Sequence, residues 1–162
     1  MAEYLHPGLV LVAAGLALTL LSGRARTALT LLAPAAAVAL VLAAPDGVAW
    51  RGTILGYPVV PYAVDALSRL FALVFAIMAL GGGLFALKQE SRVEGPAAFV
   101  YAGSAIGVTL AGDLITVFVF WELMALGSTL VIWSAGTASA YRASVRYLMI
   151  HLLGGVVLMV GI

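Results

Sequence analysis

Long apolar runs separated by short polar connections make up most of this chain. An α-helix rises 1.5 Å per residue, so about 20 apolar residues cross the hydrocarbon layer of a bilayer. Six of the runs approach or reach that length. They predict one transmembrane domain, residues 1–162, with helices at about 7–22, 27–44, 64–87, 96–112, 114–134 and 145–162.

The connection between the second and third runs has a different character. It opens with the turn signal Pro45-Asp46-Gly47, and the following segment 48–62 mixes β-branched and aromatic residues with Gly52 and Gly56. This segment is too polar and too interrupted to span a membrane. Its composition predicts a short hairpin at the membrane surface.

Composition supports the membrane interpretation. Of the 162 residues, 64% are hydrophobic and 9% are charged, whereas about 25% are charged in soluble domains. The chain is predicted to be an all-α integral membrane protein. Its net charge of +1, without a basic run, argues against nucleic-acid binding. It has no cysteine, and its two histidines are far apart. We therefore predict neither a metal site nor a cofactor.

The basic residues predict an orientation. Alternate connections place two arginines, Arg51 and Arg69, on one side of the membrane. Six basic residues lie on the other side: Arg24, Arg26, Lys88, Arg92, Arg142 and Arg146. Lys and Arg accumulate on cytoplasmic loops. The N-terminus and the hairpin are therefore expected outside the cytoplasm.

Glu122 is the central candidate for function. It lies near the middle of the apolar run 114–134, where a carboxylate costs a few kcal/mol to insert. Its helical neighbours at three- and four-residue spacing are all apolar: Phe118, Val119, Ala125 and Leu126. This cost favours a role in a proton or cation path. The alternative is a glutamate held permanently in a buried pair or a hydrogen-bond network.

His151 is the second candidate for the proton path, because histidine titrates near neutral pH. It lies about two turns into the sixth run, one turn before Gly154 and Gly155, where another helix could approach closely. A neutral histidine bonded to a backbone carbonyl is an equally good interpretation. His6 is expected at a membrane surface without a role.

Three further charged residues lie near helix starts. Asp65 and Arg69 have the i, i+4 spacing of a helical salt bridge, and Asp113 is placed to cap the fifth helix. We favour these structural roles over a role as an accessory ion pair or pathway mouth.

Gly103, Gly107 and Ala111 repeat every four residues along the fourth run. Small residues at this spacing let two helices pack closely in a membrane. This stripe predicts a helix-packing surface.

Three stretches resemble a known family. They are Phe120-Trp-Glu-Leu-Met-Ala125 with its flanks, Arg146-Tyr147 followed by His151-Leu-Leu-Gly-Gly155, and Val64 to Phe71. The family comprises the antiporter-like subunits of Mrp-type Na⁺/H⁺ antiporters, membrane-bound hydrogenases and respiratory complex I. Within this family these sequence motifs are most similar to those of the D-type subunits of the Mrp antiporters.

The resemblance implies that Glu122 is the fifth-helix glutamate that pairs with a lysine on a later, broken helix. The only lysine in these 162 residues, Lys88, lies in a predicted cytoplasmic loop. The partner lysine, the broken helices and the second half of the family's inverted repeat are missing. The chain is therefore expected to be an N-terminal fragment or one half of a split subunit.

The function implied is that of the N-terminal portion of a proton-translocating subunit in a multisubunit cation/proton antiporter. Such a subunit is a transporter and not an enzyme. It would lie in a bacterial cell (inner) membrane, with other membrane subunits, H⁺ and Na⁺ or another monovalent cation, and the lipid bilayer as its partners. Three alternatives remain open: a membrane subunit of a complex I-like or hydrogenase-like redox pump, a non-transporting scaffold, and an independent oligomeric carrier.

Overall fold

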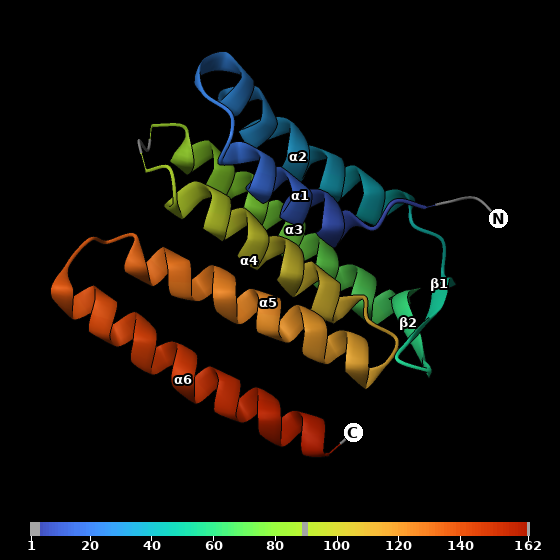
Figure 1. The fold of residues 1–162 in the computed structure, drawn as a ribbon. Coiled ribbons are helices and arrows are strands. Elements are labelled where there is room, and N and C mark those ends of the chain that lie inside the picture. Colours follow the sequence, from blue (N-terminus) through green and yellow to red (C-terminus); the bar gives the residue numbers. More distant parts are fainter. Residues whose placement is uncertain (1–3, 89–90, 162) are drawn as a thin grey trace.

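The computed structural model describes residues 4–88 and 91–161. These residues form six α-helices and one antiparallel two-stranded sheet (Figure 1). In chain order the elements are α1 (Pro7–Leu18), α2 (Gly23–Ala43), β1 (Gly47–Ile54), β2 (Tyr57–Val64), α3 (Ala66–Ala86), α4 (Glu94–Thr109), α5 (Leu114–Trp133) and α6 (Ala138–Val160). The expected all-α membrane fold, with a hairpin between the second and third helices, is confirmed.

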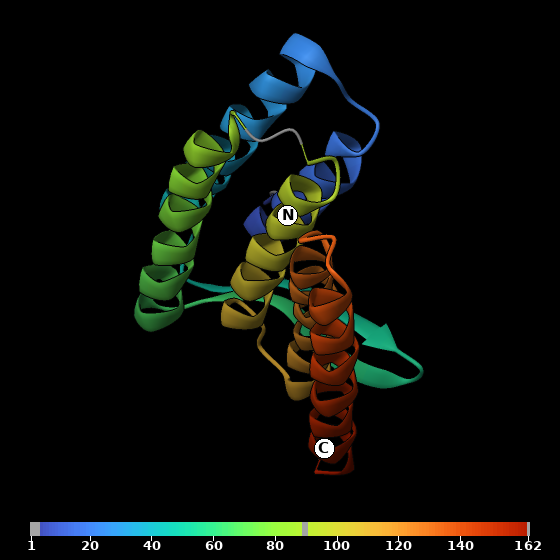
Figure 2. The same cartoon turned by 90° about the vertical axis from the view of Figure 1, so that its left-hand side faces the viewer.

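The helices pack as a bundle whose last member lies at the edge. Helix α4 packs between α1 and α5, α3 packs against α2 and α4, and α6 packs mainly on α5. Figure 1 shows α6 at one margin, and Figure 2 shows α2 and α3 together on the opposite side. The hairpin, the start of α1 and the end of α6 lie at the same end of the bundle. The α1–α2 and α5–α6 connections lie at the other end.

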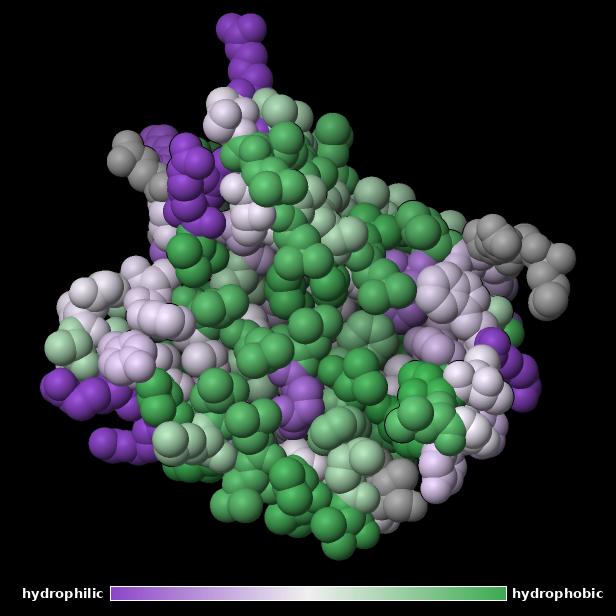
Figure 3. All heavy atoms as spheres, in the orientation of Figure 1, coloured by the Kyte–Doolittle hydropathy of each residue, from purple (hydrophilic) through white to green (hydrophobic). Residues whose placement is uncertain are grey.

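Among the described residues, four helices are long and apolar enough to cross a bilayer: α2, α3, α5 and α6, with 20 to 23 residues each. Helices α1 and α4 have 12 and 16 residues, or about 18 Å and about 24 Å at 1.5 Å per residue. The outer surface carries many exposed large hydrophobic side chains, and Figure 3 shows that hydrophobic residues dominate the face it draws. The chain is a multi-pass membrane protein.

The helix ends differ from those predicted by the apolar runs. Helix α6 starts at Ala138 rather than near 145, because the Thr137 hydroxyl oxygen accepts the backbone N–H of Ala140 and caps the helix. Helix α2 starts at Gly23 and includes Arg24 and Arg26. Hydropathy marks the part of a helix suited to lipid, whereas capping groups mark where the helix itself ends. Ile162, at the end of the expected sixth helix, lies outside the described residues.

The small-residue stripe of α4 serves two different neighbours. A Cβ atom at Gly103 would lie 2.5 Å from the Gly8 carbonyl oxygen of α1, and one at Gly107 would overlap the Phe120 ring of α5. Gly103 and Gly107 therefore permit close approach of two helices. Ala111 lies beyond the end of α4, in the connection to α5, so the prediction that it belongs to the same helical stripe is wrong.

The hairpin is fastened to that connection. Strands β1 and β2 meet at a two-residue turn, Leu55-Gly56, where both residues have positive φ, as a type I′ turn requires. The Ala63 N–H donates to the Leu110 carbonyl at 2.8 Å, and the Gly112 N–H donates to the Val60 carbonyl at 2.8 Å. These two bonds explain why α4 stops at Thr109, since the backbone turns aside to pair with β2.

Candidate functional site

The Glu122 carboxylate is buried and has no hydrogen-bond partner among the described residues. Glu122 is near the middle of α5, and both of its carboxylate oxygens are buried without a hydrogen-bond partner in the described structure. The salt bridge found among residues 4–88 and 91–161 joins Arg69 to Asp46, so no described cation pairs with Glu122. Buried polar atoms in proteins are nearly always satisfied, and exceptions point to strain, function or an additional group.

Gly155 of α6 makes room for this carboxylate. A Cβ atom at position 155 would overlap Glu122 Oε1, and it would lie 2.9 Å from Glu122 Cδ and 3.4 Å from the Phe118 ring. The backbone of α6 therefore passes directly over the Glu122 side chain. We name the surface between these two helices the α5–α6 seam, defined by Trp121, Glu122 and Ser128 on α5 and Tyr147, His151 and Gly155 on α6.

His151 lies in the same seam. Its ring is 5.5 Å from the Trp121 ring and 5.6 Å from the Tyr147 ring, measured between centroids. Its Nε2 atom is buried without a hydrogen-bond partner in the described part of the chain. The structure thus brings the two candidate proton-path residues to one helix pair, although they are distant in sequence.

Two seam residues were missed by sequence reasoning. The Ser128 hydroxyl donates to Tyr147 Oη across the seam at 3.0 Å. Serine and tyrosine are common in membrane helices, so only their placement on facing helices identifies this pair. The sequence did offer one indication of their position, which is helical spacing. Ser128 lies seven residues after Trp121 and therefore on the same side of α5, and Tyr147 lies four residues before His151 and therefore on the same side of α6.

Asp65 and Arg69 do not form the expected i, i+4 salt bridge. Asp65 Oδ1 accepts the Ser68 N–H at 2.7 Å, and the Asp65 N–H donates to the Ser68 hydroxyl at 2.8 Å, a reciprocal capping box at the start of α3. The Arg69 guanidinium donates to Asp46, beside the start of β1. The prediction failed because the capping box occupies the Asp65 carboxylate and the hairpin supplies Arg69 with another acid.

Asp113 caps α5 and holds the hairpin. Its Oδ1 accepts the Thr116 N–H at 2.9 Å, and its Oδ2 accepts the Val60 N–H of β2 at 2.6 Å together with the Thr116 hydroxyl. Partial burial of the carboxyl favours its protonated form, but the hydrogen bonds from Thr116, Val60 and Ile115 outweigh burial and lower the pKa of Asp113.

We expect Asp113→Ala to loosen the junction between α5 and the hairpin. The variant loses a helix cap, worth about 1 kcal/mol, and leaves the Val60 N–H without its acceptor, which adds roughly 1–3 kcal/mol. Thermal unfolding in detergent should shift to lower temperature. Asp65→Ala is the matched control, because that cap is exposed and contacts only its own helix. Equal shifts for the two variants would contradict a role in fastening the hairpin.

His6 is buried between the start of α1 and the hairpin. Its exposed fraction is 0%, and its Nδ1 accepts the backbone N–H groups of Gly8 and Leu9 at the start of α1. Three aromatic rings surround it: Trp50 and Tyr62 from the hairpin and Phe120 from α5. Burial lowers the pKa of His6 to about 4, against an opposing influence of the Pro61 carbonyl.

This burial predicts an acid-sensitive fold. Between pH 6.5 and about 4 the unfolded chain binds a proton at His6 and the folded chain does not. The free energy of unfolding is therefore highest, as far as His6 decides it, above pH 6.5, and it decreases as the pH falls toward 4. The loss approaches roughly 3 kcal/mol at the low end of this range. Unfolding of wild type and of His6→Asn, which keeps a capping oxygen but does not titrate, should be followed in detergent from pH 7.5 to 4. The same pH slope in both proteins would exclude His6 as the cause.

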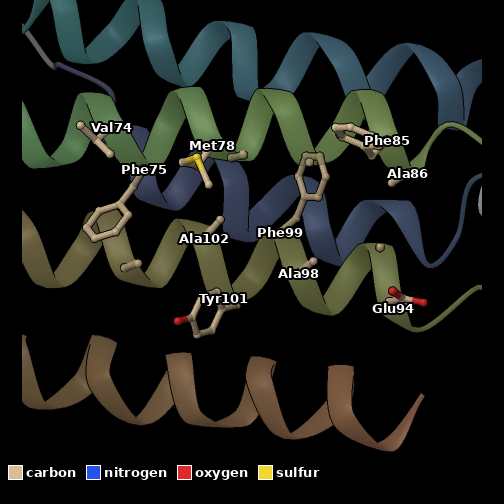
Figure 4. Close-up of a pocket in the computed structure, with 15 residues that line it drawn as sticks. Val74, Phe75, Met78, Phe85, Ala86, Glu94, Ala98, Phe99, Tyr101 and Ala102 are labelled. Carbon is tan, nitrogen blue, oxygen red and sulfur yellow. The ribbon is translucent and has the colours of Figure 1, made fainter. Parts of the chain in front are cut away.

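A large groove lies elsewhere, between α3 and α4. Its volume is about 800 Å³, and Figure 4 shows Phe75, Met78 and Phe99 among its lining residues. Apolar side chains form nearly all of its wall, with Glu94 and Tyr101 as exceptions. Neither Glu122 nor His151 lines this groove. Within the described residues, no three His, Cys, Asp or Glu side chains come together as a set that could hold a metal ion.

Comparison with known proteins finds similarity to one family of membrane subunits. Residues 111–162, which contain α5 and α6, match the family model described as "NADH:quinone oxidoreductase/Mrp antiporter, TM". The resemblance to the antiporter-like subunits is confirmed. The segment that carries this antiporter-like signature is the same helix pair that encloses Glu122 and His151. No solved structure matches the chain.

Individual relatives extend the similarity toward the N-terminus. The D-type subunit of the Na⁺/H⁺ antiporter of Alkalihalophilus pseudofirmus is 28% identical over 117 residues, which cover 67% of this chain and 24% of the relative. Its counterpart in Bacillus subtilis is 29% identical over 108 residues, covering 62% and 21%. The A-type subunit of the A. pseudofirmus antiporter is 31% identical over 106 residues, covering 60% and 13%. The matched part of this antiporter-like chain therefore spans a quarter or less of the relatives' length.

Proposed function

We propose that this chain is the N-terminal portion of a proton-translocating subunit in a multisubunit cation/proton antiporter, and that Glu122 takes up and releases the transported proton. The observation that carries the proposal is the buried Glu122 carboxylate, whose two oxygens have no partner in the described structure. Its helix belongs to the segment that matches the antiporter family model.

The physical basis is the sensitivity of a buried acid to nearby charge. Removal from water disfavours the ionised form of any carboxylate. A cation brought beside it favours the ionised form and releases the proton. Glu122 therefore responds to any basic group that moves toward and away from it. In this proposal that group lies outside the described residues, on a further segment or on another membrane subunit.

His151 acts beside Glu122 in the same proposal. An imidazole can accept a proton at one ring nitrogen and release one from the other. His151 Nε2 has no hydrogen-bond partner among the described residues, so it is available for such an exchange, and the Trp121 ring packs against the imidazole in the seam. Chemically the site moves protons and forms no other covalent bond. The subunits to which this chain is similar are named as parts of antiporters, which are transporters.

The deciding experiment is Na⁺-driven proton flux across vesicles that contain the assembled complex with Glu122→Gln. Loss of flux with normal assembly supports the proposal, whereas unchanged flux overturns it. Loss of assembly with normal flux per assembled complex would instead favour a scaffold.

A redox-driven pump is the second candidate. The observation that favours it is the family description, which names NADH:quinone oxidoreductase beside the Mrp antiporter. Proton translocation that follows the addition of a reductant, and that occurs without an imposed Na⁺ gradient, would support this alternative.

A further inference from the structure

The Ser128–Tyr147 hydrogen bond differs from the other hydroxyl bonds of α5. The hydroxyls of Thr129 and Ser134 bond to carbonyls of their own helix. Ser128 Oγ reaches across the seam to Tyr147 Oη at 3.0 Å, and it also lies 3.0 Å from the carbonyl oxygens of Met124 and Ala125. It is therefore placed to bond either along its own helix or across the seam.

This arrangement makes the bond reversible. A serine hydroxyl has one proton to donate and can also accept. When the Ser128 proton points to the Met124 or Ala125 carbonyl, Tyr147 becomes the donor to Ser128. When it points across the seam, Tyr147 is the acceptor and its own proton is free to point elsewhere. A proton relay requires hydroxyls that can exchange donor and acceptor roles.

The seam groups follow one another toward Glu122. Tyr147, His151 and Gly155 are spaced four residues apart, so they lie on one side of α6 with a rise of about 6 Å between successive positions. Tyr147 and His151 are in ring contact, with centroids 5.6 Å apart. Gly155 contacts the Glu122 carboxylate. Steps of this size are within the reach of a single bridging water molecule.

Exposure decreases along the same direction. Tyr147 is 37% exposed, whereas His151 Nε2 and the two Glu122 oxygens are buried. The connection between α5 and α6 precedes Tyr147 by about two turns of helix, and the first turns of α6 after it carry the exposed Arg142 and Arg146. The seam thus runs from a polar, accessible end of the bundle to a buried acid.

We propose that Tyr147 and Ser128 form the proton intake of this seam and pass protons through His151 to Glu122. A proton from the side of the α5–α6 connection binds at the Tyr147–Ser128 pair, and the pair releases another toward one nitrogen of His151. The other nitrogen then gives its proton to the Glu122 carboxylate. One proton enters and one reaches Glu122 in each cycle. This route rests on the proposed role of Glu122 as the proton-carrying group.

The test is a double-mutant cycle on the assembled complex in vesicles. Tyr147→Phe removes the hydroxyl but keeps the ring on His151, and Ser128→Ala removes the other partner. We expect each single variant to slow proton flux about tenfold, with the double variant no slower than either one, because each substitution breaks the same relay. Tyr101→Phe and Ser134→Ala remove hydroxyls outside the seam and should leave flux unchanged.

Two readouts distinguish a relay from a structural bond. If proton delivery limits the variants, flux should slow further in D₂O, and a small permeant weak acid such as formic acid should restore it by carrying protons past the missing hydroxyl. Additive losses that formic acid does not rescue would overturn the relay. Normal flux in Tyr147→Phe with abolished flux in Glu122→Gln would overturn this intake route while leaving the proposed function standing. Normal flux in Glu122→Gln would overturn the proposed function itself.

Discussion

Glu122→Gln is expected to reduce Na⁺-driven proton flux by at least about 100-fold, the range typical for removing a positioned proton-transfer group. Glutamine has nearly the same shape as glutamic acid, so it fits beneath Gly155, but its amide cannot take up or release a proton near neutral pH. The loss would therefore arise from the missing ionisable group and not from altered packing.

The matched control is Glu94→Gln, which makes the same chemical change at the start of α4, on the wall of the α3–α4 groove. Flux should be measured by a pH-sensitive dye in vesicles and normalised to the amount of assembled complex. Glu122→Asp adds a second comparison, because it keeps the acid but shortens its reach, and an intermediate rate is expected. Equal losses in the variants at positions 94 and 122 would show that the substitution acts through folding.

Gly155→Ala is expected to have the second-largest effect, a fall in proton flux of about 10- to 100-fold. The added methyl group would occupy the space now held by Glu122 Oε1. Because that atom is the far end of a flexible side chain, the carboxylate can rotate away while the two helices stay in place. Displacing a reacting group by about 1 Å can slow a reaction by this amount. The variant thus changes the position of the acid rather than its chemistry.

Gly154→Ala is the matched control from the neighbouring position, since a Cβ atom at position 154 would meet nothing within 4 Å. Alanine is also the better helix former at both positions, so neither variant should destabilise α6. We expect normal assembly for both and reduced flux for Gly155→Ala alone. Normal flux in Gly155→Ala would show that the position of the carboxylate beneath Gly155 is unimportant for transport.

Sequence alone could predict features that depend on position along the chain. The apolar runs revealed a helical membrane protein, the segment after Pro45 revealed a hairpin, and the position of Glu122 in its run placed an acid near the middle of an apolar helix. Each follows from the fixed rise of a helix and from the cost of placing charge in lipid. The sequence motifs around Glu122 and His151 also indicated the antiporter-like family. The match of residues 111–162 to the family model agrees with that resemblance.

Only the tertiary structure decided which groups meet across elements. Helix α5 is apolar on nearly all sides, so its sequence does not show which face meets α6 and which meets lipid. The burial of His6 beneath the hairpin, the pairing of Arg69 with Asp46, the Tyr147–Ser128 bond and the contact of Gly155 with Glu122 all depend on that missing information. Periodicity describes one helix at a time, whereas these contacts depend on how helices and hairpin rotate and pack against one another.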